Sequence, residues 1–145
     1  MKRLTFLLIF SVISTNSLAA NIDWTSAFKG IAAGEQIWLD KVPELAGVAD
    51  VKQSQDVQAA LSSALSTNTA GTLKVLDIID THDWPHVVGT DIVCMGPMNK
   101  SANEIEAFYQ KTRISLLSTD KGAVCLWVLE ATYEEWKAGK SKQEK

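Results

Sequence analysis

The two cysteines of this 145-residue chain constrain its fold more than any other feature. Cys94 and Cys125 lie in the last third of the chain, on either side of a segment with helical spacing. Two cysteines in an exported protein form a disulfide more often than they remain free thiols. No CxxC or Cys/His spacing accompanies them, so a metal pair lacks support. We therefore predict a Cys94–Cys125 bridge, and the chain-entropy model values its loop of 31 residue steps at about 3.5 kcal/mol.

The N-terminus predicts an oxidising compartment. Lys2 and Arg3 precede an apolar run at residues 4–13, and Ser17-Leu18-Ala19 places small residues at the positions that signal peptidase reads. The apolar run is shorter than the roughly 20 residues of a membrane-spanning helix. We predict that residues 1–19 are a signal peptide, with a cut after Ala20 as the alternative. The remaining chain is then periplasmic or secreted, with no stable membrane anchor.

The charge of the chain excludes some classes of partner. Loss of residues 1–19 removes Lys2 and Arg3 and no acidic residue, so the formal net charge falls from −3 to −5. An acidic protein is poorly suited to nucleic acid, which attracts basic patches, and to anionic lipid surfaces. The sequence contains no phosphate-binding loop and no dinucleotide fingerprint, so no cofactor is predicted. The expected partner is another protein.

Hydrophobic periodicity predicts an all-α fold. We expect a single small domain over residues 20–139, followed by a flexible polar tail at 140–145. Apolar residues recur at helical spacing in about five segments, and Pro43 is expected to end the first. These segments lie near residues 23–42, 51–66, 70–80, 101–118 and 123–137, with a less regular helix near 84–92. The alternative is an α+β fold with short strands near 90–95 and 123–129.

The C-terminal block is predicted to be a helical hairpin tethered by the disulfide. Ser101 and Glu104 form a capping-box pattern at the start of its first helix. Residues 123–129 of its second helix are apolar all round, which is typical of a buried segment. Of the five tryptophans, we expect Trp38, Trp127 and Trp136 to lie in the core.

The stretch His82-Asp83-Trp84-Pro85-His86 holds both histidines of the chain. Proline favours the first turn of a helix, so a helix should begin inside this stretch, which excludes the HExxH geometry. Metal binding would need further ligands such as Asp91, and zinc sites use three or four, so no metal site is predicted. An exposed Trp84 could instead contact a partner, because tryptophan is enriched at interface hot spots. The predicted partner-binding residues are His82, Asp83, Trp84 and His86.

No catalytic frame is evident in the sequence. Glu130 and Glu134 share a helix face, but glycosidase chemistry needs an enclosed carboxyl, and a solvated face is the simpler interpretation. Nucleophile motifs such as GxSxG and SxxK do not occur. We therefore predict no catalytic residues.

The leading functional hypothesis is an exported, non-enzymatic binding protein, such as a protein inhibitor or an immunity protein. A structural or chaperone-like accessory of the cell envelope is the first alternative. A small hydrolase that uses His82 or His86 is the second.

Overall fold

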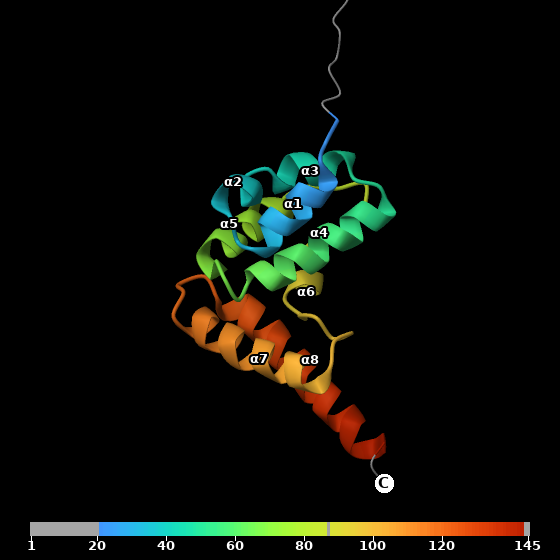
Figure 1. Ribbon diagram of the computed structural model, residues 1–145. Helices are drawn as coiled ribbons and strands as arrows, with labels where there is room; N and C mark the ends of the chain where they lie inside the picture. Colours follow the sequence, from blue (N-terminus) through green and yellow to red (C-terminus); the bar gives the residue numbers. More distant parts are fainter. Residues whose placement is uncertain (1–20, 87, 144–145) are drawn as a thin grey trace, which may run out of the picture.

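A computed structural model of the protein describes residues 21–86 and 88–143. The predicted signal peptide lies outside the described residues. Within them the chain forms eight helices and no strand (Figure 1). The helices are α1 (Trp24–Ala32), α2 (Gln36–Leu39), α3 (Val42–Val48), α4 (Val51–Ala64), α5 (Thr69–Ile79), α6 (Thr90–Val93), α7 (Ala102–Leu117) and α8 (Ala123–Gln143). The all-α prediction is confirmed, and the α+β alternative is wrong because both segments suggested as strands are helical.

The helices form two groups joined by the short helix α6. Helices α1 to α5 make a compact bundle in which α1 packs along α4, and the α7–α8 hairpin lies beside this bundle (Figure 1). Helix α6 contacts α4 on one side and α8 on the other, and α5 contacts α7. The hairpin is thus attached to the bundle through α5 and α6.

The first predicted helix, residues 23–42, is divided into α1 and α2, and a further helix, α3, begins at its last residue. These additional helices are the main reason for eight helices instead of about five. Helix α1 stops because Gly34 adopts a left-handed conformation with φ of +74°. The amide of Gly34 donates to the carbonyl of Ile31, and the amide of Glu35 donates to that of Gly30, as in a Schellman cap. Pro43 does not end a helix. It lies in the first turn of α3, where its missing N–H costs no hydrogen bond.

The turn at Gly34 brings Trp38 back against α1. A Cβ atom built on Gly30 would lie 1.9 Å from Cδ1 of Trp38, so the indole occupies the place of a side chain. Gly30 and Gly34 therefore have different uses in this contact. Gly30 receives an aromatic ring, and Gly34 makes the turn that delivers it.

Capping boxes define the starts of α4 and α7, and the second is the one that the sequence predicted. Asp50 accepts a hydrogen bond from the amide of Gln53 at 2.8 Å, and the Gln53 side chain accepts one from the amide of Asp50 at 2.9 Å. Ser101 and Glu104 form the same reciprocal box at the start of α7. Each cap satisfies amides that would otherwise lack a partner and contributes about 1 kcal/mol.

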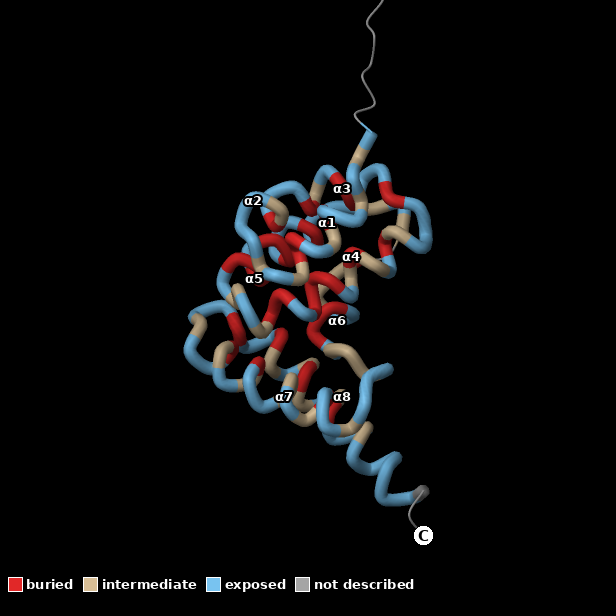
Figure 2. The backbone as a smooth tube through the Cα atoms, in the orientation of Figure 1, coloured by how far each residue is buried: buried red, intermediate tan, exposed pale blue. Residues whose placement is uncertain are grey.

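Every helix contributes buried side chains to the core, and the short helices α2 and α6 contribute one each, Leu39 and Val93. Figure 2 shows buried positions along the inward side of the bundle and hairpin. Helix α8 contributes one regular buried face, formed by Cys125, Leu129 and Tyr133 at four-residue spacing. Its last described turn is exposed, and the helix extends through Gln143 into the region predicted to be a tail. The largest fully buried side chains include Ile31, Leu39, Leu61, Leu65, Leu76, Ile79, Ile105, Leu116 and Leu129.

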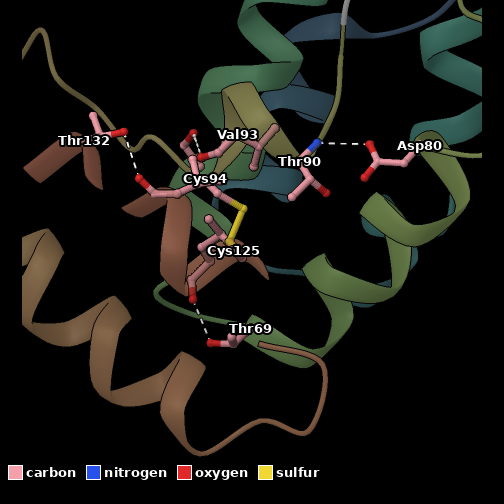
Figure 3. The surroundings of a disulfide bond; sticks show 10 residues. Thr69, Asp80, Thr90, Val93, Cys94, Cys125 and Thr132 are labelled. Carbon is pink, nitrogen blue, oxygen red and sulfur yellow. Dashed lines mark hydrogen bonds between the residues drawn. A yellow bond between two sulfur atoms is a disulfide. The ribbon is translucent and has the colours of Figure 1, made fainter. Parts of the chain in front are cut away.

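The predicted disulfide is present and joins α6 to α8. Cys94 and Cys125 are both buried, with their Cα atoms 5.2 Å apart (Figure 3). Hydrogen bonds hold α6 from its other side: Ser62 of α4 donates to the carbonyl of Val93 at 2.7 Å, and the amide of Thr90 donates to Asp80 at 3.0 Å. The bridge therefore connects the hairpin covalently to a segment that is itself anchored on the bundle.

We expect replacement of both Cys94 and Cys125 by serine to lower the free energy of unfolding by about 3 kcal/mol, because the unfolded chain regains the entropy of an open loop. Urea unfolding followed by circular dichroism measures the loss. The wild-type protein treated with a reducing agent serves as the control and should approach the stability of the variant. An unchanged unfolding midpoint in the variant would contradict a stabilising role for the bridge.

Gly30→Ala tests the contact between α1 and Trp38. The new Cβ would collide with the indole, and such overpacking costs roughly 1–3 kcal/mol. Gly139→Ala is the matched control, because no atom lies within 4 Å of the corresponding Cβ position in α8. The control should be neutral or gain up to about 1 kcal/mol from helix propensity. Equal thermal stability of the two variants would show that Trp38 does not occupy this place.

Candidate interaction surface

The stretch at residues 82–86 is a loop between α5 and α6. The predicted helix start within it is wrong, because α6 begins only at Thr90 and its N-cap is Gly89. Trp84 is half-buried, and its indole N–H donates to the carbonyl of Ile79 at 2.7 Å. This bond ties the loop to the end of α5. The same carbonyl also accepts from the amide of His82 at 3.2 Å, so two groups of the loop bond to the end of the helix.

The side chains of this loop make local contacts. The Nδ1 atom of His82 lies 3.0 Å from the carbonyl of Ile78 and 2.9 Å from the hydroxyl of Thr81. Its ring lies 5.6 Å from that of Trp84. His82 and Asp83 are exposed, and the described part of the chain contains no group of three or more residues placed to hold a metal ion. A partner contact or a hydrolase role at this loop stays a prediction.

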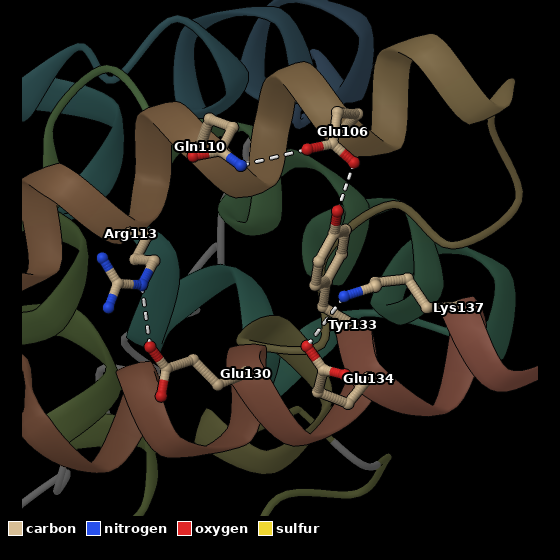
Figure 4. Close-up of polar contacts among 7 residues, drawn as sticks. All are labelled: Glu106, Gln110, Arg113, Glu130, Tyr133, Glu134 and Lys137. Atoms are coloured by element: carbon tan, nitrogen blue, oxygen red, sulfur yellow. Dashed lines mark hydrogen bonds and ion pairs between the residues drawn. The ribbon is translucent and has the colours of Figure 1, made fainter.

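Polar side chains line the seam between α7 and α8 (Figure 4). Arg113 donates from Nε to Glu130 at 2.8 Å, and Lys137 lies 3.2 Å from Glu134. Glu130 and Glu134 are therefore each paired with a cation. A carboxylate paired in this way at the surface is typical of a solvated helix face, as the sequence indicated.

A hydrogen bond across the seam links Glu106 of α7 to Tyr133 of α8. The Tyr133 hydroxyl donates to the Glu106 carboxylate, which also accepts from Gln110 at 3.0 Å (Figure 4). The bond to Glu106 raises the pKa of Tyr133 to about 12, and the bond from Tyr133 lowers the pKa of Glu106. Tyr133 also stacks on Tyr109 with ring centroids 3.7 Å apart. At neutral pH the tyrosine is neutral and the carboxylate is charged, an arrangement that holds the hairpin together.

The outer side of α8 is apolar and exposed. Trp127 is 74% exposed and Val124 is 62% exposed, so the prediction that Trp127 lies in the core is wrong. The reason is helical geometry. Position 127 lies between the buried positions 125 and 129, about half a turn from each, and therefore points away from the core.

Together with Met95, which follows the C-cap of α6, these residues form one surface. We call it the Trp127 face and define it by Met95 and by four residues of α8: Val124, Trp127, Val128 and Ala131. A hollow of about 260 Å³ lies between Trp127 and Met95, with Asp91 and Glu135 at its edge. A second hollow of about 210 Å³ lies on the other side of Val124, and its lining includes Asp77, Asp80, Asp91 and Lys121.

The apolar stretch at residues 123–129 was a signal in the sequence for this face. Residues 123–129 are apolar all round, and we interpreted them as buried all round. In the structure one side of this stretch packs on the core while Val124 and Trp127 on the other side remain exposed. A helix that is apolar on two sides and packs on the core with only one of them leaves the other side without a packing partner.

A wider groove of about 630 Å³ runs between α4, α1 and the turn that precedes α7. Its floor is formed by Phe28, Ala59 and Ala60, and Pro97 and Lys100 lie on the turn. The volume falls in the range of small-molecule sites. Its lining combines apolar and neutral polar side chains with Lys100 and with Asp56, which is paired with Lys52.

Tyr133→Phe should reduce the stability of the protein in a pH-dependent way. The pKa of Tyr133 is raised from 10.0, so the stabilisation by its bond is present below pH 10 and is lost towards pH 12. The pKa of Glu106 is lowered from 4.5, so its contribution is present above pH 4.5 and is lost in acid. The wild type should therefore exceed the variant most between about pH 5 and pH 10.

Urea unfolding at a series of pH values measures this difference. Tyr109→Phe, which keeps both stacked rings and the bond between Tyr133 and Glu106, is the control and should not reproduce the acid-dependent part. A constant difference between wild type and Tyr133→Phe across the pH range would show that the hydroxyl acts by packing alone.

Comparison with known proteins gives no functional information about this site. No protein-family model matches the chain, and neither a curated protein nor a solved structure is significantly similar to it. No helix among the described residues combines the length and apolar character needed to cross a membrane. The formed disulfide is typical of proteins outside the reducing cytosol. Any functional assignment must rest on the surfaces described above.

Proposed function

We propose that this protein is a non-enzymatic binding protein that holds another protein through the Trp127 face. The observation that carries the proposal is the 74% exposure of Trp127 beside the exposed apolar side chains of Met95 and Val124. Exposed apolar clusters on a folded domain mark interaction sites. Tryptophan is among the residues most enriched at interface hot spots, where a few side chains supply most of the binding energy.

The disulfide that lies beneath the face supports this role because it fixes the geometry of the surface. Cys125 is buried directly beneath it and is bonded to Cys94, which immediately precedes Met95 of the face. The two parts of the face are therefore held at a constant separation by a covalent bond. A preorganised surface loses little conformational entropy on binding, which favours affinity. An inhibitor or immunity protein, which acts by occupying its partner, benefits from this rigidity.

The compartment proposed for this activity is the periplasm or the exterior of the cell. The predicted signal peptide motivates this proposal, and the disulfide is consistent with it. The partner would then be an envelope protein or a secreted enzyme.

A chaperone-like accessory of the envelope is a second candidate. It is favoured by further exposed apolar residues on α7, namely Ile114 at 64% and Leu117 at 58% exposure. A chaperone would bind many unfolded clients weakly, whereas an inhibitor would bind one folded protein tightly. Titration with a reduced, unfolded model protein distinguishes the two.

In the test, the immobilised protein is used to capture partners from a periplasmic extract. The purified product of the neighbouring gene is tested for capture in a separate assay. Each captured protein is identified, purified and titrated by calorimetry against the wild type and against Trp127→Gln. Loss of a hot-spot tryptophan costs about 2 kcal/mol or more, so we expect the variant to bind at least about 30-fold more weakly.

Ile114→Gln is the matched control, because Ile114 is similarly exposed but lies on α7 outside the Trp127 face. It should bind like the wild type. A triple replacement of His82, Asp83 and His86 by alanine tests the loop surface in the same assay. The proposal fails if no partner is captured at micromolar concentration, or if the partner binds Trp127→Gln as tightly as the wild type.

A further inference from the structure

We infer that the Trp127 face is built for a cationic partner: a protein segment that places an apolar side chain between α6 and α8 and lysine or arginine residues on the acidic edge. This inference rests on the proposed function and specifies the chemistry of the partner. It follows from the charges around the face, from their lack of internal partners and from the size of the hollow.

Carboxylates surround the apolar centre on both sides. Asp91 and Glu135 border the hollow beside Trp127, and Asp77 and Asp80 border the hollow beside Val124. Among the residues that line these two hollows the only cation within the described part of the chain is Lys121. Its ammonium group lies 3.1 Å from Asp77, so the charge of Lys121 is already matched.

Asp91 and Glu135 are exposed, and neither side chain has a hydrogen-bond or ion-pair partner among the described residues. The carboxylates of the α7–α8 seam differ in this respect, because Glu106, Glu130 and Glu134 each have a partner. Among the carboxylates that line the two hollows, Asp77 pairs with Lys121 and Asp80 accepts from the amide of Thr90, so Asp91 and Glu135 are the two without a partner among the described residues. A cation supplied by a partner would complement both of them.

The charge pattern disfavours a second copy of this chain as the occupant. Contact between two such faces would bring their acidic edges together, and like charges across an interface oppose association. The apolar centre consists of five residues, whereas a standard interface has about 20–30 residues on each side. The face suits the anchor region of a complementary heteromeric interface better than a self-association surface.

The size of the hollow indicates what enters it. Its volume of about 260 Å³ lies below the range of about 300–1,000 Å³ that is usual for small-molecule sites. Its walls are Trp127, Val128 and Ala131 of α8 and Met95, and methionine adapts its shape to different partners. A single protruding apolar side chain fits this setting. An amphipathic helix of the partner would supply that anchor together with flanking basic residues.

The experiment uses two synthetic amphipathic peptides of about 18 residues, long enough to form a helix. One has leucines on one face and lysines on the other, and its counterpart has glutamate in place of every lysine. Each is titrated into the oxidised, ¹⁵N-labelled protein, and the indole N–H signal of Trp127 is followed by NMR. The signal is assigned by its absence from Trp127→Phe.

We expect the lysine peptide to shift the Trp127 signal and the glutamate peptide to leave it unchanged. The double variant Asp91→Asn/Glu135→Gln should weaken binding of the lysine peptide about fivefold to tenfold, since each exposed ion pair contributes a modest amount. Raising the salt concentration from about 0.05 M to about 0.3 M should weaken it further, because exposed charges are screened.

Glu35→Gln/Glu44→Gln is the matched control, because it removes two exposed carboxylates that do not line the face. It should bind the lysine peptide like the wild type. Equal weakening in both double variants would overturn the inference, since binding would then depend on net charge alone. Equal binding of the two peptides, or no shift with either, would also overturn it.

These outcomes are separable from the test of the proposed function. If Trp127→Gln loses its captured partner while the lysine peptide shows no preference over the glutamate peptide, the face binds protein but without selecting cations. If sedimentation shows a dimer that is abolished by Trp127→Gln, a second copy covers the face, and both proposals fail.

Discussion

The covalent bond between Cys94 and Cys125 is the connection on which the arrangement of this protein depends. It joins α6, which hydrogen bonds hold on the helical bundle, to α8, the longer helix of the hairpin. Helix α6 has only four residues and could not hold its position by helix propensity, because short helices are marginal in water. The bond therefore orients two groups of helices relative to each other and brings Met95 next to Trp127.

The same helix supports the fold and presents the surface proposed for binding. One side of α8 buries Cys125, Leu129 and Tyr133, while the other exposes Val124 and Trp127. The polar seam with α7 fixes the rotation of α8 about its axis through the bonds of Glu106 and Glu130. Rotation of the helix would exchange buried for exposed residues, so these seam contacts indirectly determine which tryptophan faces solvent. Scaffold and surface are consequently parts of one element.

Some elements could be predicted from local sequence because their causes are local. The capping box at Ser101 needs only residues three positions apart, and α7 begins where the pattern indicated. The division of the first segment into α1 and α2 was missed because Gly34 is compatible with a helix. The turn at Gly34 is favoured by the packing of Trp38 on Gly30, which no spacing within the segment reveals. The loop at residues 82–86 was missed for a related reason: Trp84 bonds to Ile79 across the turn instead of opening a helix.

The sequence by itself determined the helical class of this protein and its disulfide. Periodicity and caps act within a few residues, and two cysteines allow one intramolecular pairing. Only the tertiary structure decided the exposure of Trp127 and the grouping of Asp91 and Glu135 around it. An apolar stretch such as residues 123–129 contains no information about how many of its sides will be covered, because that depends on which distant helices reach it. The candidate interaction surface is a product of packing, and its residues come together only when α6 and α8 are joined.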